Sequence, residues 1–169
     1  MKVIKKQRNS RMCIICGMDN PVGLKAQFYN MEDGSVVCPF QFREEHQSFP
    51  QRVHGGLTAT MMDEIGLRAL WVDKDENTFG VTMSMEIKFR KPVPYNEDLL
   101  ARAIVEKETS KFLIAKAELY TTKGELLSNA EIRYLKLSVE KIADNIDEHK
   151  EMCYLIEDGI TEIYCPWAD

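Results

Sequence analysis

The stretch from Val53 to Trp71, VHGGLTATMMDEIGLRALW, restricts the fold of this chain more than any other part of the sequence. It opens with a histidine and two glycines, a combination that lets a ligand approach bare backbone. Apolar residues then recur at three- and four-residue steps, at Leu57, Met61, Met62, Ile65, Ala69 and Leu70. This spacing is typical of a helix with an apolar face, and it predicts one central helix.

Two carboxylates, Asp63 and Glu64, interrupt this apolar helix. Burying an unpaired charge is costly, so the pair requires a reason. Asp63 follows His54 by nine residues, which is about two and a half turns at 3.6 residues per turn. The two residues therefore cannot share a helical face. A site that joins them must be completed by another segment or by another copy of the chain.

The composition is that of one globular domain, with or without an appendage: 169 residues, 44% hydrophobic and 29% charged. A net charge of −5 without a basic block argues against a nucleic-acid partner. No run of 18 apolar residues occurs, so we expect no membrane span. The basic start lacks an apolar segment behind it, and the five cysteines are an odd, scattered set. Together these features indicate reduced thiols and a cytoplasmic protein.

The chain begins with a solvated basic arm over residues 1–11, followed by a CxxC pair at Cys13 and Cys16. Zinc needs about four ligands, and neither a second CxxC nor a histidine pair follows. We therefore expect two small buried thiols that shape a turn, and no bound metal. A zinc- or partner-binding module built on this pair is the alternative from a different functional class.

The remaining sequence predicts strands. Leu24 to Tyr29 and Ser35 to Phe42 flank a turn at Glu32-Asp33-Gly34, which indicates a hairpin, and a polar loop over residues 43–50 leads to the helix. After the helix, residues 82–89 alternate with a period of two, placing Met83, Met85, Ile87 and Phe89 on one face and Thr82, Ser84, Glu86 and Lys88 on the other. Further strands are expected at Leu99 to Val105, Phe112 to Tyr120 and Leu126 to Leu137.

These elements give an α+β fold with about six antiparallel strands and one central helix, the last four strands forming a meander. Residues 138–158 are weakly amphipathic, with Val139, Ile142, Ile146, His149 and Cys153 at helical steps, and predict a C-terminal helix. The closing residues 160–169 are too apolar for a free tail and are expected to dock on the domain.

The helix start carries the chemistry. Two glycines there expose backbone N–H groups at the positive end of the helix dipole, where they can polarise a carbonyl. A carboxylate in an apolar wall tends to have a raised pKa, which suits a general base or a nucleophile. Without a serine or cysteine nucleophile elbow, this combination suggests hydrolysis of an activated ester. The plainer alternative is a glycine pair needed for packing and a carboxylate on a solvated face.

His54-Gly55-Gly56, with Asp63 nine residues after the histidine, resembles the signature of hotdog-fold acyl-CoA thioesterases, and of their phenylacetate-degradation (PaaI-like) branch in particular. The resemblance covers residues 12–137, between the arm at 1–11 and a C-terminal extension at 138–169. It includes three further motifs in family order, at residues 13–24, 45–50 and 88–94.

This resemblance implies a sheet wrapped around the central helix and a dimer or tetramer with its sites at subunit interfaces. The Gly55 N–H, within the motif completed by Gly56, would polarise the thioester carbonyl. Asp63 would activate water or attack directly, Thr82 would assist it, and His54 would order the loop. The substrate would be an acyl-CoA, and no cofactor is implied beyond the coenzyme A of the substrate.

Substrate-binding residues are expected both before and after the central helix in the sequence. Related enzymes carry an amide about six residues before the histidine, where this chain has Ser48, with Gln47 one residue earlier. Arg90 and Lys91 are expected to bind the coenzyme A phosphates.

The chain departs from the family at Gln51 and Arg52, where glycine and an apolar residue are usual. This departure supports one alternative, a hotdog protein that binds acyl-CoA without turnover, as a sensor or carrier. A hotdog dehydratase or hydratase fits the spacing from His54 to Asp63 less well than a thioesterase does.

Overall fold

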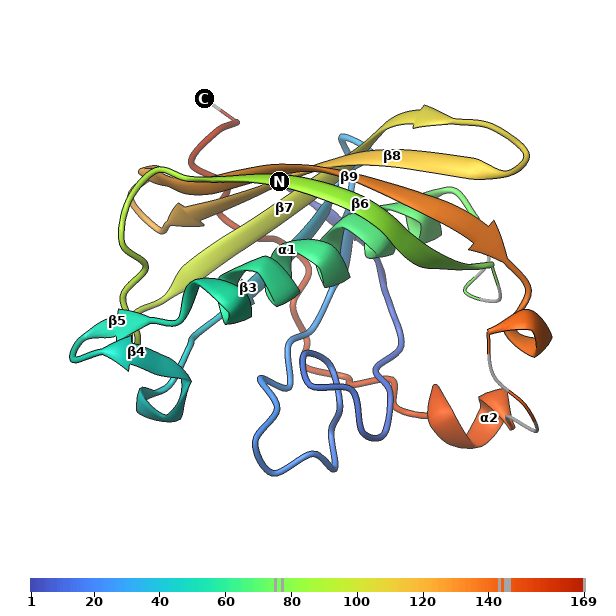
Figure 1. Ribbon diagram of the computed structural model, residues 1–169, viewed down its shortest axis with the longest axis horizontal. Coiled ribbons are helices and arrows are strands. Elements are labelled where there is room, and N and C mark those ends of the chain that lie inside the picture. Colours follow the sequence, from blue (N-terminus) through green and yellow to red (C-terminus); the bar gives the residue numbers. More distant parts are fainter. Residues whose placement is uncertain (75, 77, 143, 145–146, 169) are drawn as a thin grey trace.

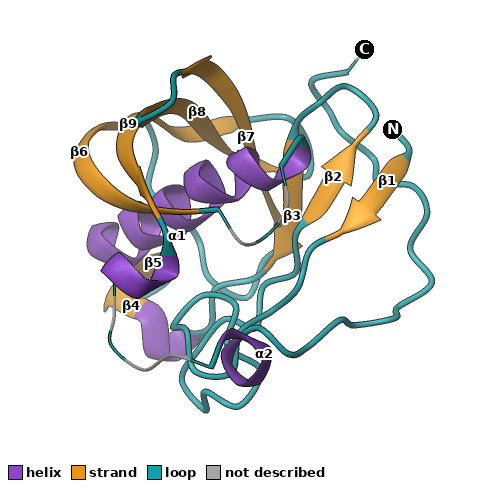
Figure 2. Ribbon diagram, turned by 90° about the vertical axis from the view of Figure 1, so that its right-hand side faces the viewer, coloured by secondary structure: helices purple, strands orange, loops and turns teal. Residues whose placement is uncertain are grey.

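One long helix lies against a curved antiparallel sheet. The computed structural model describes residues 1–74, 76, 78–142, 144 and 147–168. Figure 1 shows helix α1 (Gly55–Arg68) running along one face of the sheet, and Figure 2 shows the sheet curving around it. The predicted arrangement, a sheet wrapped around one central helix, is confirmed. No helix in the described residues is long and apolar enough to cross a bilayer.

Seven strands form the main sheet, in the order β1-β2-β3-β7-β8-β9-β6. Their bounds are β1 Val3–Lys6, β2 Tyr29–Met31, β3 Val36–Phe40, β6 Phe79–Phe89, β7 Leu99–Glu108, β8 Phe112–Thr121 and β9 Leu126–Leu137. A separate two-stranded ribbon, β4 (Gln47–Phe49) with β5 (Arg52–Val53), precedes α1. Short 3-10 turns occupy Glu44–His46, Ala69–Val72 and Val139–Lys141.

The predicted meander is wrong in one connection. Strands β7, β8 and β9 follow one another in the sheet as expected, but β6 pairs with β9 instead of β7. The chain after β6 passes across the sheet through the loop at residues 90–98, and β6 is left at the edge. Its ladder with β9 runs from Phe79 opposite Leu137 to Phe89 opposite Ser128.

The first residues do not form the predicted solvated arm. Val3–Lys6 pairs with Tyr29–Met31 as strand β1, which extends the sheet beyond the predicted hairpin. Met1 and Val3 pack against a second apolar cluster of buried residues that the helix does not cover: Tyr29, Met31, Val37, Leu100, Ile163 and Cys165. Lys5 and Lys6 make this strand look polar in the sequence, and part of the apolar cluster that it joins, Ile163 and Cys165, comes from the far end of the chain.

The predicted long C-terminal helix is also wrong. In the described residues it is reduced to α2 (Glu148–Glu151) and the turn at Val139–Lys141; Ile146 lies outside them. The expected docking of the closing residues is present: Ile163 N–H donates to the Met1 carbonyl at 3.0 Å. Trp167 stacks on Tyr120 with ring centroids 4.9 Å apart.

The main core lies between α1 and the sheet. Met61, Met62 and Ile65 of the helix are fully buried, as the periodicity predicted. Opposite them lie alternate residues of the central strands, including Leu113, Ala115 and Ala117 of β8. Gly66 allows a close helix–sheet approach, since a Cβ built there would lie 2.4 Å from the Tyr134 hydroxyl.

Candidate active site

The start of α1 is closed by His54. This residue is the N-cap, in an extended conformation, and its Nδ1 accepts a hydrogen bond from the Gly56 N–H at 2.9 Å. An accepting Nδ1 places the hydrogen of the neutral ring on Nε2. The ring of His54 is thus engaged with backbone, and its role in ordering the loop stays a prediction.

Gly55, the first residue of α1, is exposed at the positive end of the helix dipole. Among the residues that the structure describes, no group accepts a hydrogen bond from its N–H. A Cβ at Gly55 would lie 3.6 Å from the ring of Phe89, the last residue of β6. The amide is therefore available to a carbonyl oxygen, and an aromatic ring lies beside it.

Asp63 is half-buried two turns further along α1, where it meets the sheet. The Thr82 hydroxyl donates to its Oδ1 at 2.7 Å, and the Tyr134 hydroxyl donates to its backbone carbonyl at 2.7 Å. Desolvation raises the pKa of the Asp63 carboxyl, and the hydrogen bond from Thr82 only partly opposes this shift. A carboxylate with a raised pKa and a fixed orientation suits proton abstraction.

The sheet register explains how both hydroxyls reach one residue. Thr82 of β6 lies directly opposite Tyr134 of β9, and the register shifts immediately afterwards, so that Ser84 faces Arg133. Met83 is the extra residue of this β-bulge. The predicted alternation, with Thr82 facing away from Met85, is wrong for this reason: a bulge changes the parity of the strand. Thr82 and Met85 both face the helix side.

Glu64, the neighbouring carboxylate, has a different environment. Its Oε1 accepts a hydrogen bond from Nε of Arg68, one turn later, at 2.9 Å. Arg68 is 2% exposed and its guanidinium lies 4.6 Å from the ring centre of Phe28 and 4.5 Å from that of Trp71. Glu64 is thus the counter-ion of a buried cation, whereas Asp63 has no cationic partner among the described residues.

The structure does not bring Gly55 and Asp63 together within one chain. Asp63 lies eight residue steps after Gly55 along the helix, which corresponds to about 12 Å along the axis. A thioester carbonyl bound at Gly55 therefore lies far from the Asp63 carboxylate of the same chain. This agrees with the geometric argument made from the sequence.

The predicted pre-helix residues lie beside the helix start. Gln47 pairs with Val53 across the ribbon, and His54 N–H donates to the His46 carbonyl at 2.9 Å. Gln47 and Ser48 are both exposed. The turn of this ribbon holds Gln51 at a φ of 68°. This left-handed conformation favours glycine, which explains why glycine is usual at this place in the family.

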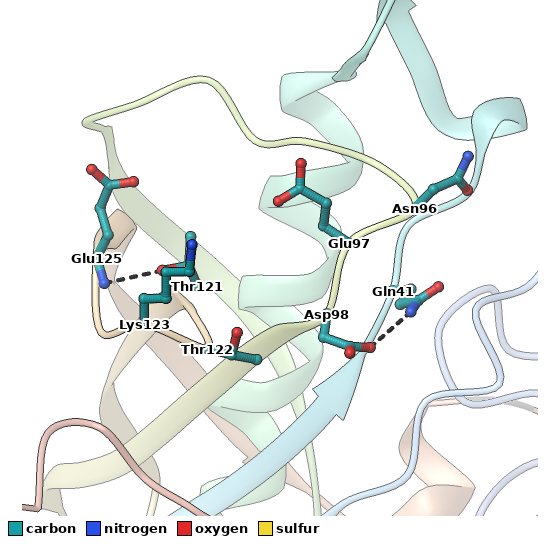
Figure 3. A pocket seen from close by; sticks show the side chains of 8 residues that line it. All are labelled: Gln41, Asn96, Glu97, Asp98, Thr121, Thr122, Lys123 and Glu125. Atoms are coloured by element: carbon teal, nitrogen blue, oxygen red, sulfur yellow. Dashed lines mark hydrogen bonds between the residues drawn. The ribbon is translucent and has the colours of Figure 1, made fainter.

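Arg90 and Lys91 are exposed just after β6, and both have partners. Arg90 Nε donates to Asn129 Oδ1 at 2.6 Å, and Lys91 forms an ion pair with Glu125. Glu125 also borders a pocket of about 660 Å³, shown in Figure 3, whose other lining residues are Gln41, Asn96, Glu97, Asp98, Thr121, Thr122 and Lys123. Its carboxylates outnumber its lysine, so this pocket would repel phosphates.

A smaller groove of about 290 Å³ opens on the outer face of the sheet, beside the bulge. It combines apolar and cationic side chains, and is lined by Met83, Lys107, Thr109, Phe112, Ile114 and Arg133. The sequence did not predict this groove, because its residues come from four strand segments that only the register brings together.

Tyr134 is the site residue that sequence reasoning missed. It is fully buried, and both burial and the nearby Asp63 carboxylate raise its pKa, so it remains a hydroxyl donor. From the sequence alone, a tyrosine in strand β9 is expected to be an ordinary core residue. The available signal was its hydroxyl, since a buried tyrosine usually finds a hydrogen-bond partner.

Comparisons with known proteins agree with this geometry. Residues 51–128 match the thioesterase superfamily. The chain is 33% identical over 86 residues to acyl-coenzyme A thioesterase 13 from Homo sapiens, covering 51% of this chain and 61% of that protein. It thus spans less than two thirds of the length of this relative.

Two solved structures share the fold. The zebrafish thioesterase superfamily member 2 aligns with a TM-score of 0.59 at 27% identity, over 66% of this chain and 80% of that one. A phenylacetic acid degradation-related protein from Ralstonia eutropha aligns with a TM-score of 0.59 at 18% identity, over 66% of this chain and 85% of that one. The resemblance to hotdog-fold thioesterases, and the hotdog fold itself, are thereby confirmed.

Proposed function

We propose that this chain, a hotdog fold whose residues 51–128 match the thioesterase superfamily, hydrolyses acyl-CoA thioesters to a free acid and coenzyme A. One observation carries the proposal: the half-buried Asp63 carboxylate has a raised pKa and accepts a hydrogen bond from Thr82. The human relative that is 33% identical bears the name acyl-coenzyme A thioesterase 13, which supports the same substrate class.

In the proposed reaction, the Gly55 N–H donates to the thioester carbonyl oxygen and stabilises the negative charge that develops there. Asp63 either takes a proton from the attacking water or attacks the carbonyl carbon itself, giving an anhydride that water then cleaves. The C–S bond breaks in both schemes, and the coenzyme A thiolate takes up a proton. Thr82 keeps the carboxylate oriented in either case.

A dimer is the arrangement that lets these groups act on one substrate. Strand β6 is an edge strand of 11 residues, and such a long free edge is unusual without a partner. Its Met83 and Phe89 side chains are each 54% exposed. Pairing through β6 would join two sheets, cover these side chains and bring the Gly55 of one subunit toward the Asp63 of the other.

We infer a reducing, cytoplasmic setting from the cysteines. All five are free, and Cys38 and Cys165 are buried as single thiols. Unpaired buried thiols are usual in compartments where disulfides do not persist.

The proposal is tested by comparing Asp63→Asn with Glu64→Gln in a turnover screen over aromatic, short-chain and long-chain acyl-CoAs. Asp63→Asn preserves shape and removes the base, so kcat should fall by a factor on the order of 10² or more. Glu64→Gln weakens the pair with Arg68 and should affect stability more than turnover. Full activity of Asp63→Asn would contradict the proposal, and binding of acyl-CoA without turnover by the native chain would favour a sensor or carrier.

The shared site is tested by mixing chains. Gly55→Pro replaces the N–H by a ring carbon and should preserve the helix, because proline is well tolerated at the first helical position and His54, with ψ at 129°, already has the conformation that precedes proline. Gly55→Ala is the matched control that keeps the N–H. Gly55→Pro alone should lose about 10²–10³ in kcat. Mixing it with Asp63→Asn should restore one intact site per heterodimer; no recovery after verified subunit exchange would show that each site is built within one chain.

A further inference from the structure

The CxxC pair near the N-terminus forms a turn that presents one sulfur to backbone donors. Sγ of Cys13 accepts hydrogen bonds from the N–H groups of Ile15 at 3.3 Å and Cys16 at 3.5 Å. The Gly17 N–H closes the turn on the Cys13 carbonyl at 2.9 Å, and a Cβ at Gly17 would lie 2.3 Å from that oxygen. Two N–H donors on one sulfur stabilise a negative charge on it.

The fold adds a third ligand that the sequence spacing did not reveal. Glu64 of α1 lies beside the pair, with Oε2 3.7 Å from Cys13 Sγ. One ligand atom from each of Cys13, Cys16 and Glu64 lies within 4.8 Å of the others. A sulfur and a carboxylate oxygen bound to one tetrahedral zinc ion lie about 3.6 Å apart, given bond lengths of about 2.3 and 2.1 Å. The observed separation therefore already matches that of two ligands on one ion.

The net charge of the cluster is compatible with a bound divalent cation. With both thiols deprotonated, the three ligands carry three negative charges, and Arg68 supplies one positive charge. Its Nη2 donates to Cys16 Sγ at 2.9 Å, while its Nε holds the other oxygen of Glu64. Arg68 thus occupies one side of two ligands and leaves Glu64 Oε2 facing the sulfurs. A divalent cation would bring the net charge of this buried group to zero.

We propose that Cys13, Cys16 and Glu64 bind one zinc-like divalent cation, with water as the fourth ligand. Cys13 and Glu64 are both partly exposed, which gives water access to that position. Binding of the cation releases the thiol protons of Cys13 and Cys16 to solvent and involves no electron transfer. Arg68 would act as a hydrogen-bond donor to the bound thiolate, a contact that typically orients and tunes a ligand.

The bound ion would fix the N-terminal loop onto α1 at the residue that follows Asp63. Asp63 itself is not a ligand, because its carboxylate is held by Thr82 on the side of the sheet. The proposal is therefore independent of the proposed thioester hydrolysis. It also gives the second carboxylate of the helix a function distinct from that of the first.

The test is cobalt binding to the full chain, reduced with a phosphine and freed of metal, with the thiol count verified before titration. Co²⁺ should bind at one equivalent per chain, with a thiolate-to-cobalt charge-transfer band and the visible bands of tetrahedral cobalt, and Zn²⁺ should displace it. Cys13→Ser should weaken binding at least about 100-fold, more than the loss of a typical outer-shell contact. Glu64→Gln should weaken binding while leaving the thiolate band.

Cys153→Ser is the matched control, since Cys153 is a free, exposed thiol outside the cluster, and it should bind cobalt as the native chain does. Circular dichroism of each metal-free variant separates loss of a ligand from loss of folding. Failure of the reduced native chain to bind cobalt would overturn the proposal, as would equal affinity in Cys13→Ser. Formation of a Cys13–Cys16 disulfide in air, without cobalt binding after reduction, would identify the pair as a redox dithiol instead.

Discussion

The contact between Gly66 and Tyr134 leads to a prediction that reverses the usual effect of a glycine in a helix. Replacing a mid-helix glycine by alanine normally stabilises a protein by about 1 kcal/mol. At Gly66 the added Cβ would lie 2.4 Å from the Tyr134 hydroxyl and 2.9 Å from Cδ1 of Ile132. Overpacking of this kind costs about 1–3 kcal/mol. Displacing the hydroxyl from the Asp63 carbonyl would cost about 1 kcal/mol more.

We therefore expect Gly66→Ala to destabilise the protein by about 1–3 kcal/mol, the sum of these three contributions. Tyr134→Phe should cost about 1 kcal/mol, because it removes one hydrogen bond and no packing. In the Tyr134→Phe background the hydroxyl is absent, and Gly66→Ala should then cost little, since the end of the Ile132 side chain can move.

Urea unfolding of the four chains closes a double-mutant cycle on this pair. The coupling should be about 1–3 kcal/mol, whereas independent sites are additive within about 0.5 kcal/mol. Additive effects would refute the reasoning, as would a stabilised Gly66→Ala chain. Either result would mean that the helix lies further from the sheet than the structure shows.

Three further predictions concern the site. Thr82→Val removes the hydrogen bond that lowers the pKa of Asp63, so the acid limb of the kcat/KM profile should move to higher pH, and an unmoved limb would contradict the assignment. The pKa of Asp63 is raised in the folded state, so protonation of Asp63 at low pH favours folding, and this contribution is lost as pH rises through the folded-state pKa. Asp63→Asn removes the charge that disfavours folding at pH 7. It should therefore raise the free energy of unfolding at that pH, as measured in urea. Substituting both Arg90 and Lys91 by Ala should raise KM for acyl-CoA and leave kcat and the turnover of a thioester lacking the nucleotide unchanged, and an unaltered KM would show that they are only solvated strand-end charges.

Much of the fold was predictable, because its signals are local. The central helix and β9 follow from hydrophobic periodicity, and β9 begins and ends at the predicted residues. The partner of β6 was not predictable, since a sequence shows which residues can form a strand but not which strand completes its edge. Strand β1 was missed for a related reason: part of the apolar cluster that it joins, Ile163, Cys165 and Trp167, lies after residue 160.

The candidate site was likewise predictable only in part. Asp63 and Thr82 were named from motif positions, and the structure places them 2.7 Å apart. The pairing of Glu64 with Arg68 follows the four-residue helical spacing. Its neighbours Cys13 and Cys16 could not be inferred, because they reach the helix through a loop without periodicity. The contact of Tyr134 with Asp63 depends on the register between β6 and β9. The alternation of residues 82–89 in the sequence predicted the wrong face for Thr82, because it does not reveal the bulge.

The bulge at Met83 has a consequence for how β6 can change in length. On either side of Met83 the ladder with β9 is regular, and Met83 is the extra residue that lies between two consecutive pairs, Thr82 with Tyr134 and Ser84 with Arg133. Deleting Met83 would leave Thr82 opposite Tyr134 and Ser84 opposite Arg133 in an unbroken ladder, and both halves would keep their present faces. Deleting Glu86 instead would turn one half of the strand over, exposing Ile87 or withdrawing Thr82 from Asp63. Single-residue losses in this strand are therefore expected to be tolerated at one position and damaging at its neighbours.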